Sequence, residues 1–165
     1  GSVMMEEGYD TDDDYFKGMD ELDSFLYGAG LEFGMTYAGW RAGLEILHDI
    51  SGEHDGQEVE LSVAYPWLVA GFELTPKLSL TWLSEKTVDY FYEVSAAEAR
   101  LDRPAYSPSS SYEIEAELMV QRPIYGSFSV IGLIGVSTFG SEITDSPLVD
   151  EDYEIEGVIG VMYTF

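Results

Sequence analysis

The sequence contains no cysteine and only seven basic residues, against 32 acidic ones in 165 residues. The missing thiols exclude a disulfide scaffold, a thiolate metal site and a cysteine nucleophile. The formal charge of −25 excludes a nucleic-acid binder, because such proteins neutralise phosphates with lysine and arginine. The longest apolar run, residues 130–136, is far shorter than the roughly 20 residues of a membrane-spanning helix.

The chain divides into an acidic arm and a longer amphipathic region. Residues 1–23 carry nine acidic side chains against the single basic Lys17, with few aliphatic residues to bury. This composition predicts a loop or a frayed arm over residues 1–23. The remaining residues, 24–165, contain enough apolar side chains to fold, and we expect them to form one domain.

Apolar residues recur at every second position after the arm, which is typical of strands with two chemically different faces. In residues 112–121, for example, Ile114 and Leu118 alternate with Glu113, Glu115 and Glu117. Helical spacing fits none of the runs as well. The alternation predicts about seven strands, over residues 31–37, 40–46, 58–67, 78–82 continued at 88–92, 112–121, a less regular 125–139, and 153–165.

Turn residues lie between these runs. Asp55-Gly56 predicts a tight hairpin, Thr75-Pro76-Lys77 a short turn, and Arg122-Pro123 the end of a strand. Longer polar connections are expected over residues 95–111 and 140–152. Such an antiparallel meander usually closes to remove its edges, so the sequence predicts an all-β protein, an up-and-down barrel of about eight strands.

Alternation alone does not say which face points inward. In a soluble barrel the apolar face fills the interior, whereas in a transmembrane β-barrel it meets lipid and the glutamates line the lumen. Strand length and the position of the aromatic residues favour the membrane, because amphipathic rings are stable at headgroup depth. The aromatic residues near strand ends are Tyr37, Trp40, Tyr65, Trp67, Tyr90, Tyr92, Tyr112, Tyr125, Phe139, Tyr153, Tyr163 and Phe165.

Several segments resemble the MipA/OmpV family of MltA-interacting outer-membrane proteins: residues 49–56 (DISGEHDG), 88–99 with Pro104-Ala105-Tyr106, and 145–150. The terminal segment, residues 157–165, is similar to the last strand that outer-membrane barrels present to their assembly machinery, with Tyr163 and Phe165 as its signal. The resemblance implies a barrel in the outer membrane of a Gram-negative bacterium. It also implies further strands before Gly8, which we expect to be absent here or reduced to the acidic arm.

The membrane orientation predicts an acidic lumen. Nine carboxylates with one guanidinium cannot be dehydrated together, so the interior must hold water, be partly protonated or be neutralised by further strands. Our hypothesis is a water-filled interior that attracts cations. The alternative is that water merely solvates these glutamates and that no solute passes along them. The predicted lumen-facing residues are Glu32, Arg41, Glu45, Glu58, Glu60, Glu113, Glu115, Glu117, Glu154 and Glu156.

Residues that carry chemistry are few. His48-Asp49 and His54-Asp55 suit a transition metal by residue type, but their spacing straddles a strand end and no third histidine exists. Residues 12–14 and 150–152 lack the glycine-spaced pattern of a calcium loop, and nothing suggests a sugar cleft around Glu113 and Glu115. There is no Gly-x-Ser-x-Gly elbow and no phosphate-binding glycine loop. We therefore predict no enzyme, no metal site and no cofactor.

Three functions remain. The family resemblance implies a scaffold that holds a lytic murein transglycosylase near a murein synthase. The acidic lumen predicts instead a narrow, cation-preferring channel for small solutes. A soluble acidic barrel that binds an apolar ligand requires the opposite orientation of every strand. For the scaffold and for the channel, the further predicted partners are the lipid bilayer and lipopolysaccharide. Lipopolysaccharide is anionic, so acidic loops would contact it through bridging divalent cations.

Overall fold

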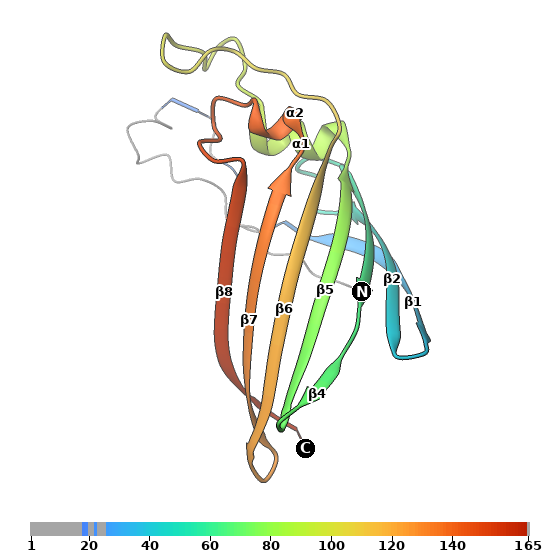
Figure 1. The fold of residues 1–165 in the computed structure, drawn as a ribbon. Helices are drawn as coiled ribbons and strands as arrows, with labels where there is room; N and C mark the ends of the chain where they lie inside the picture. The colour runs from blue at the N-terminus through green and yellow to red at the C-terminus, as the bar shows by residue number, and fades with distance from the viewer. Residues whose placement is uncertain (1–17, 20–21, 23–25, 165) are drawn as a thin grey trace.

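The computed structural model describes residues 18–19, 22 and 26–164 (Figure 1). Residues 1–17, most of the predicted acidic arm, and Phe165 of the predicted assembly signal lie outside the described residues. The elements are β1 (Gly28–Tyr37), β2 (Trp40–Asp49), β3 (Gln57–Ala64), β4 (Trp67–Val69), β5 (Phe72–Leu83), α1 (Glu85–Tyr92), β6 (Ser111–Tyr125), β7 (Phe128–Phe139), α2 (Ser141–Thr144) and β8 (Tyr153–Tyr163).

The strands form one sheet in the order β1-β2-β3-β5-β6-β7-β8, and every neighbouring pair is antiparallel. Short β4 pairs with β5 beyond the end of β3, so β3 and β4 together occupy one strand position. The prediction of an antiparallel, up-and-down sheet with about eight strands is confirmed. The irregular apolar stretch 125–139 forms mainly β7.

The sheet is open, so the prediction of a closed barrel is wrong for the described chain. Among the described strands, β1 pairs only with β2, and β8 only with β7. The physical reason is strand direction. Seven strand positions alternate in direction, so β1 and β8 run the same way, and joining them would place a parallel pair in an otherwise antiparallel sheet.

Two predicted turns were wrong. Thr75-Pro76-Lys77 lies inside β5, where Pro76 is opposite Leu118 of β6. Its missing N–H is tolerated because the neighbouring strand is interrupted there, between Ala64, which ends β3, and Trp67, which begins β4. Arg122-Pro123 does not end its strand either, since β6 continues to Tyr125 with a register shift.

Residues 88–92, predicted to continue a strand, are helical. Ser84 is the N-cap of α1, and its hydroxyl accepts a hydrogen bond from the Thr87 N–H at 3.4 Å. Val88 and Tyr92 are four residues apart, a spacing that suits a helix face as well as a strand face. Neither helix in the described part of the chain has the length and hydrophobicity needed to cross a bilayer.

The two ends of the sheet differ. At one end β1–β2 and β4–β5 are joined by the two-residue turns Ala38-Gly39 and Ala70-Gly71, in which all four residues have positive φ. This conformation matches the twist of the paired strands. At the other end lie both helices and the long connections, and the predicted tight hairpin at Asp55-Gly56 is a longer loop over residues 50–56 (Figure 1).

The sheet contains no conventional hydrophobic core. Among the described residues five hydrophobic side chains are buried, and none of them lies in a strand: Met19, Leu26, Val88, Val94 and Ile143. In contrast, thirty large hydrophobic residues in the described part of the chain are exposed, and most lie on the strands. A soluble protein rarely exposes more than a few hundred Å² of continuous apolar surface. The described residues therefore leave the apolar face without a cover.

Candidate functional site

The glutamates of the strands lie in transverse rows on one face of the sheet, which we call the polar face. One row joins Glu32, Glu45 and Glu60 through the register of β1, β2 and β3. The next brings together Ser79, Glu115, Ser137 and Glu154. The predicted residues therefore share a face, although the glutamates on edge strands β1 and β8 are exposed and the glutamates on central strands are half-buried.

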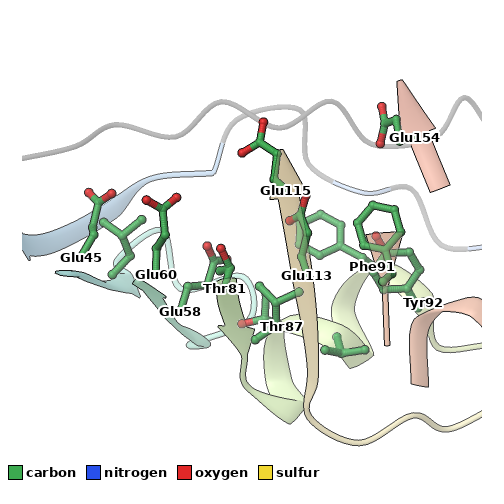
Figure 2. A pocket seen from close by; sticks show the side chains of 14 residues that line it. Glu45, Glu58, Glu60, Thr81, Thr87, Phe91, Tyr92, Glu113, Glu115 and Glu154 are labelled. Atoms are coloured by element: carbon green, nitrogen blue, oxygen red, sulfur yellow. The ribbon is translucent and has the colours of Figure 1, made fainter. Parts of the chain in front are cut away.

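A cavity of about 530 Å³ lies on the polar face at the end that carries the helices. Residues from β2 and β8, five strand positions apart, line it together, so the sheet is curved around it. Its wall combines carboxylates with the rings of Phe91 and Tyr92 from α1 (Figure 2). The carboxylates that line the cavity are Glu45, Glu58, Glu60, Glu113, Glu115 and Glu154.

A lysine that the sequence analysis missed lies on this face. Lys77 is placed there because it belongs to β5 and not to a turn, and its Nζ lies 3.1 Å from a carboxylate oxygen of Glu60. Ser79 donates a hydrogen bond to Glu115 at 3.3 Å. Arg41, the predicted basic partner, is exposed in the same row as Lys77 and Glu117. The polar face thus carries its positive charge further from the helices than most of its glutamates.

The long connections fold into a compact unit over this end of the sheet. We call residues 84–110 and 140–152 the cap. The largest fully buried side chains among the described residues all belong to it: Arg103, Ile143, Val88 and Val94. From the sequence, residues 95–111 and 140–152 were expected to be polar connections and residues 88–92 part of a strand, so a core built from Val88, Val94 and Ile143 was not predicted.

Hydrogen bonds join the two parts of the cap. The Ser146 hydroxyl donates to the Tyr92 carbonyl at 2.8 Å, and the Tyr106 hydroxyl donates to the Glu142 carbonyl at 3.1 Å. The Ser109 N–H donates to the Glu142 carboxylate at 2.9 Å. These bonds cross more than 30 residues of sequence, so the cap is held by tertiary contacts and is not a set of independent loops.

The two histidines that were considered as metal ligands make hydrogen bonds to Gly56 in loop 50–56 instead. Asp49 accepts hydrogen bonds from the N–H groups of Ser51, His54 and Asp55 at 2.8, 3.1 and 2.9 Å. His48 Nδ1 lies 2.9 Å from the Gly56 carbonyl oxygen. Within the described ranges, no three histidine or acidic residues are grouped as a metal site requires.

The opposite, apolar face carries aromatic residues near both ends of the strands. At the short-turn end Trp40 lies 5.0 Å from Tyr65, and Phe128 lies 4.9 Å from Tyr163, between ring centroids. At the cap end Trp82 is opposite Tyr112 in the register of β5 and β6. Exposed aliphatic residues such as Leu61 and Leu80 fill the space between. Aromatic belts around an aliphatic band are typical of a surface that meets lipid.

Comparison with known proteins agrees with this arrangement. The family model described as "MltA-interacting protein MipA" matches residues 2–165. The chain belongs to the MipA family. The resemblance inferred from the sequence motifs is therefore confirmed. Relatives of this MipA-family chain include proteins named outer membrane proteins.

The chain is 28% identical over 158 residues to the MltA-interacting protein of Escherichia coli (strain K12), covering 94% of this chain and 63% of that protein. It is 30% identical over 118 residues to YiaT of the same strain, covering 71% of this chain and 48% of YiaT. Outer membrane protein Omp26La of Vibrio anguillarum is 22% identical over 143 residues, covering 86% of this chain and 55% of that protein. The chain thus spans less than two thirds of these relatives. No solved structure shows a significant match.

Proposed function

We propose that the sheet forms part of the wall of a transmembrane β-barrel in the outer membrane of a Gram-negative bacterium, where it serves as a non-catalytic docking partner for a lytic murein transglycosylase and a murein synthase. The apolar face carries the membrane part of this proposal. Leu61 and Ile114 are 53% and 39% exposed, whereas the soluble alternative requires them at the centre of the protein. Lipid would cover this face, and lipopolysaccharide, bridged by divalent cations, would surround the acidic cap.

Closure of the barrel requires an odd number of further antiparallel strands between β1 and β8, because bacterial single-chain barrels have an even total. Such barrels have short periplasmic turns and longer extracellular loops. By this rule the cap faces outward, and the turns Ala38-Gly39 and Ala70-Gly71 face the periplasm. The last strand, β8, ends at the exposed Tyr163, which we propose is part of the assembly signal together with Phe165.

The docking role predicts co-purification with a lytic murein transglycosylase. Murein lies in the periplasm, so the enzyme must contact the short-turn end of the sheet. We expect Leu68→Glu, at a side chain that is 84% exposed beside Ala70-Gly71, to weaken capture of the tagged enzyme in a pull-down at physiological salt. Leu101→Glu, at a fully exposed side chain of the cap, should leave capture unchanged. No capture by the unaltered protein would remove the docking role for this family member.

The cavity on the polar face favours a second function, passage of small cationic solutes. Six glutamates line it, and Glu60 is paired with Lys77. In planar bilayers we expect cation preference at neutral pH. The double variant Glu60→Gln/Glu115→Gln should lower the cation-to-anion permeability ratio by at least about twofold, because it removes two negative charges from the wall, one of them the carboxylate that pairs with Lys77. Glu85→Gln on the exposed side of α1 is the control. Conductance without cation preference would contradict this function.

A further inference from the structure

Loop 50–56 closes on itself through the ring of His54. The Gly56 N–H donates a hydrogen bond to His54 Nδ1 at 3.0 Å. A ring nitrogen accepts a hydrogen bond only while it carries no proton, so this contact requires neutral His54 with its proton on Nε2. Gly56 is buried, and a Cβ at this position would collide with both His54 Nδ1 and Thr87 Oγ1 of α1. Gly56 therefore lies in close contact with both the His54 ring and Thr87 of α1.

The same loop holds the start of α1. The His54 ring lies 5.2 Å from the ring of Tyr90 and 6.1 Å from that of Phe91, between centroids. Gln57, next to Gly56, donates its N–H to the Ser84 hydroxyl at 2.9 Å and accepts the Ser84 N–H at 2.9 Å. The N-cap of α1 thus depends on the backbone that Gly56 positions. Movement of Gly56 would therefore loosen α1, whose residues Thr87 and Phe91 line the cavity.

Several charged groups surround His54. Asp49 and Asp55 favour its protonated form, whereas His48 and Lys86 of α1 oppose it. Glu58 of β3 shares a small cavity with it, and Tyr90 packs on its ring. Burial outweighs the two aspartates and holds the pKa of His54 below its ordinary value. Neutral His54 is consequently favoured in the folded loop, and acid should act against the folded arrangement.

We propose that His54 is a pH-sensitive latch: it fastens loop 50–56 to α1 while Nδ1 is unprotonated, and it releases the helix in mildly acidic solution. A proton on Nδ1 faces the Gly56 N–H, so two donors meet where a hydrogen bond existed. The direction follows from linkage. Because the folded state binds this proton more weakly than the open loop does, the latch is complete above the ordinary histidine pKa of about 6.5 and weakens as the pH falls below it. Since the latch is a property of the cap, it does not depend on the proposed docking or transport role.

Hydrogen exchange tests the latch in the full chain, refolded in detergent micelles and corrected for intrinsic exchange rates. Between pH 7.5 and pH 5, we expect protection of residues 50–56 and 84–92 to fall by about tenfold, while β6 and β7 stay protected. His54→Asn places Oδ1 where Nδ1 accepts the Gly56 N–H and cannot titrate. This variant should lose the acid response. His48→Gln, which retains a donor for the Gly56 carbonyl, should keep it.

An NMR titration of the unaltered protein gives a test that needs no substitution. Nδ1 of His54 should be unprotonated at pH 7.5, and the ring should titrate below its ordinary pKa. A protonated Nδ1 at pH 7.5 would overturn the latch, and so would an acid response that persists unchanged in His54→Asn. Unchanged exchange in the unaltered protein between the two pH values would overturn it as well. None of these results bears on capture of the transglycosylase or on cation preference.

Discussion

Leu61→Arg is expected to lower the free energy of unfolding in a lipid bilayer by about 2 to 4 kcal/mol, the cost of arginine on the lipid face near the bilayer midplane. Leu61 lies on the apolar face in one row with Leu44, Leu80 and Ile114, between the aromatic residues of the two strand ends. Its side chain is 53% exposed. If water covered this face, a surface substitution of this kind would change stability by no more than about 0.5 kcal/mol. The size of the loss thus distinguishes lipid from water.

Val69→Arg is the matched control. Val69 has the same 53% exposure and lies on the same face, but at the short-turn end of the sheet. Its register partner Phe72 already has the guanidinium of Arg122 over its ring at 4.6 Å. The native protein therefore accommodates an arginine at this level, and we expect a loss of about 1 kcal/mol or less, as near the bilayer interface.

Urea unfolding in lipid vesicles, followed by tryptophan fluorescence, measures both values. Equal losses for Leu61→Arg and Val69→Arg would show that depth along the strand does not matter. A loss close to zero at both positions would place the apolar face in water and remove the membrane function altogether.

The two faces of the sheet could be predicted from the sequence because the pleat has a period of two. Once Ile114 and Glu115 are in one strand, they must point to opposite sides, and the register then brings Glu115 beside Ser79. Alternation does not give the side that curves inward. The structure supplies this, since Glu115 lines a cavity and Ile114 is exposed.

The sequence-based prediction was wrong where the same residue pattern is compatible with two different local structures. Val88, Tyr90 and Tyr92 alternate as in a strand, yet the Ser84 cap and the burial of Val88 select a helix. Pro76 indicated a turn, because the sequence alone does not show that the neighbouring strand is broken opposite it. This error also hid Lys77 from the set of polar-face residues. The cap core could not be predicted either, since its contacts join segments far apart in sequence.

The second large loss of stability is expected for a substitution in the core of the cap. Ile143→Ala is expected to destabilise the cap by about 2 to 5 kcal/mol, because the side chain is 1% exposed and its removal leaves a cavity in a packed core. The loss should be local. None of the hydrophobic side chains that are buried among the described residues belongs to a strand, so the sheet does not depend on this core. Protease cleavage within residues 84–110 and 140–152 should increase, while β6 and β7 remain resistant.

Ile134→Ala separates packing in the cap from contact with lipid. Ile134 lies on the apolar face of β7 and is 56% exposed, so lipid chains would fill the space that its side chain leaves. Without a cavity the cost is only the lost transfer free energy, about 1 to 2 kcal/mol, and cap protection should not change. If Ile143→Ala instead unfolded cap and strands in one transition, the two would form a single cooperative unit. The acid response of His54 would then spread into β6 and β7, whereas a separate cap confines it to the helix and loop that the latch joins.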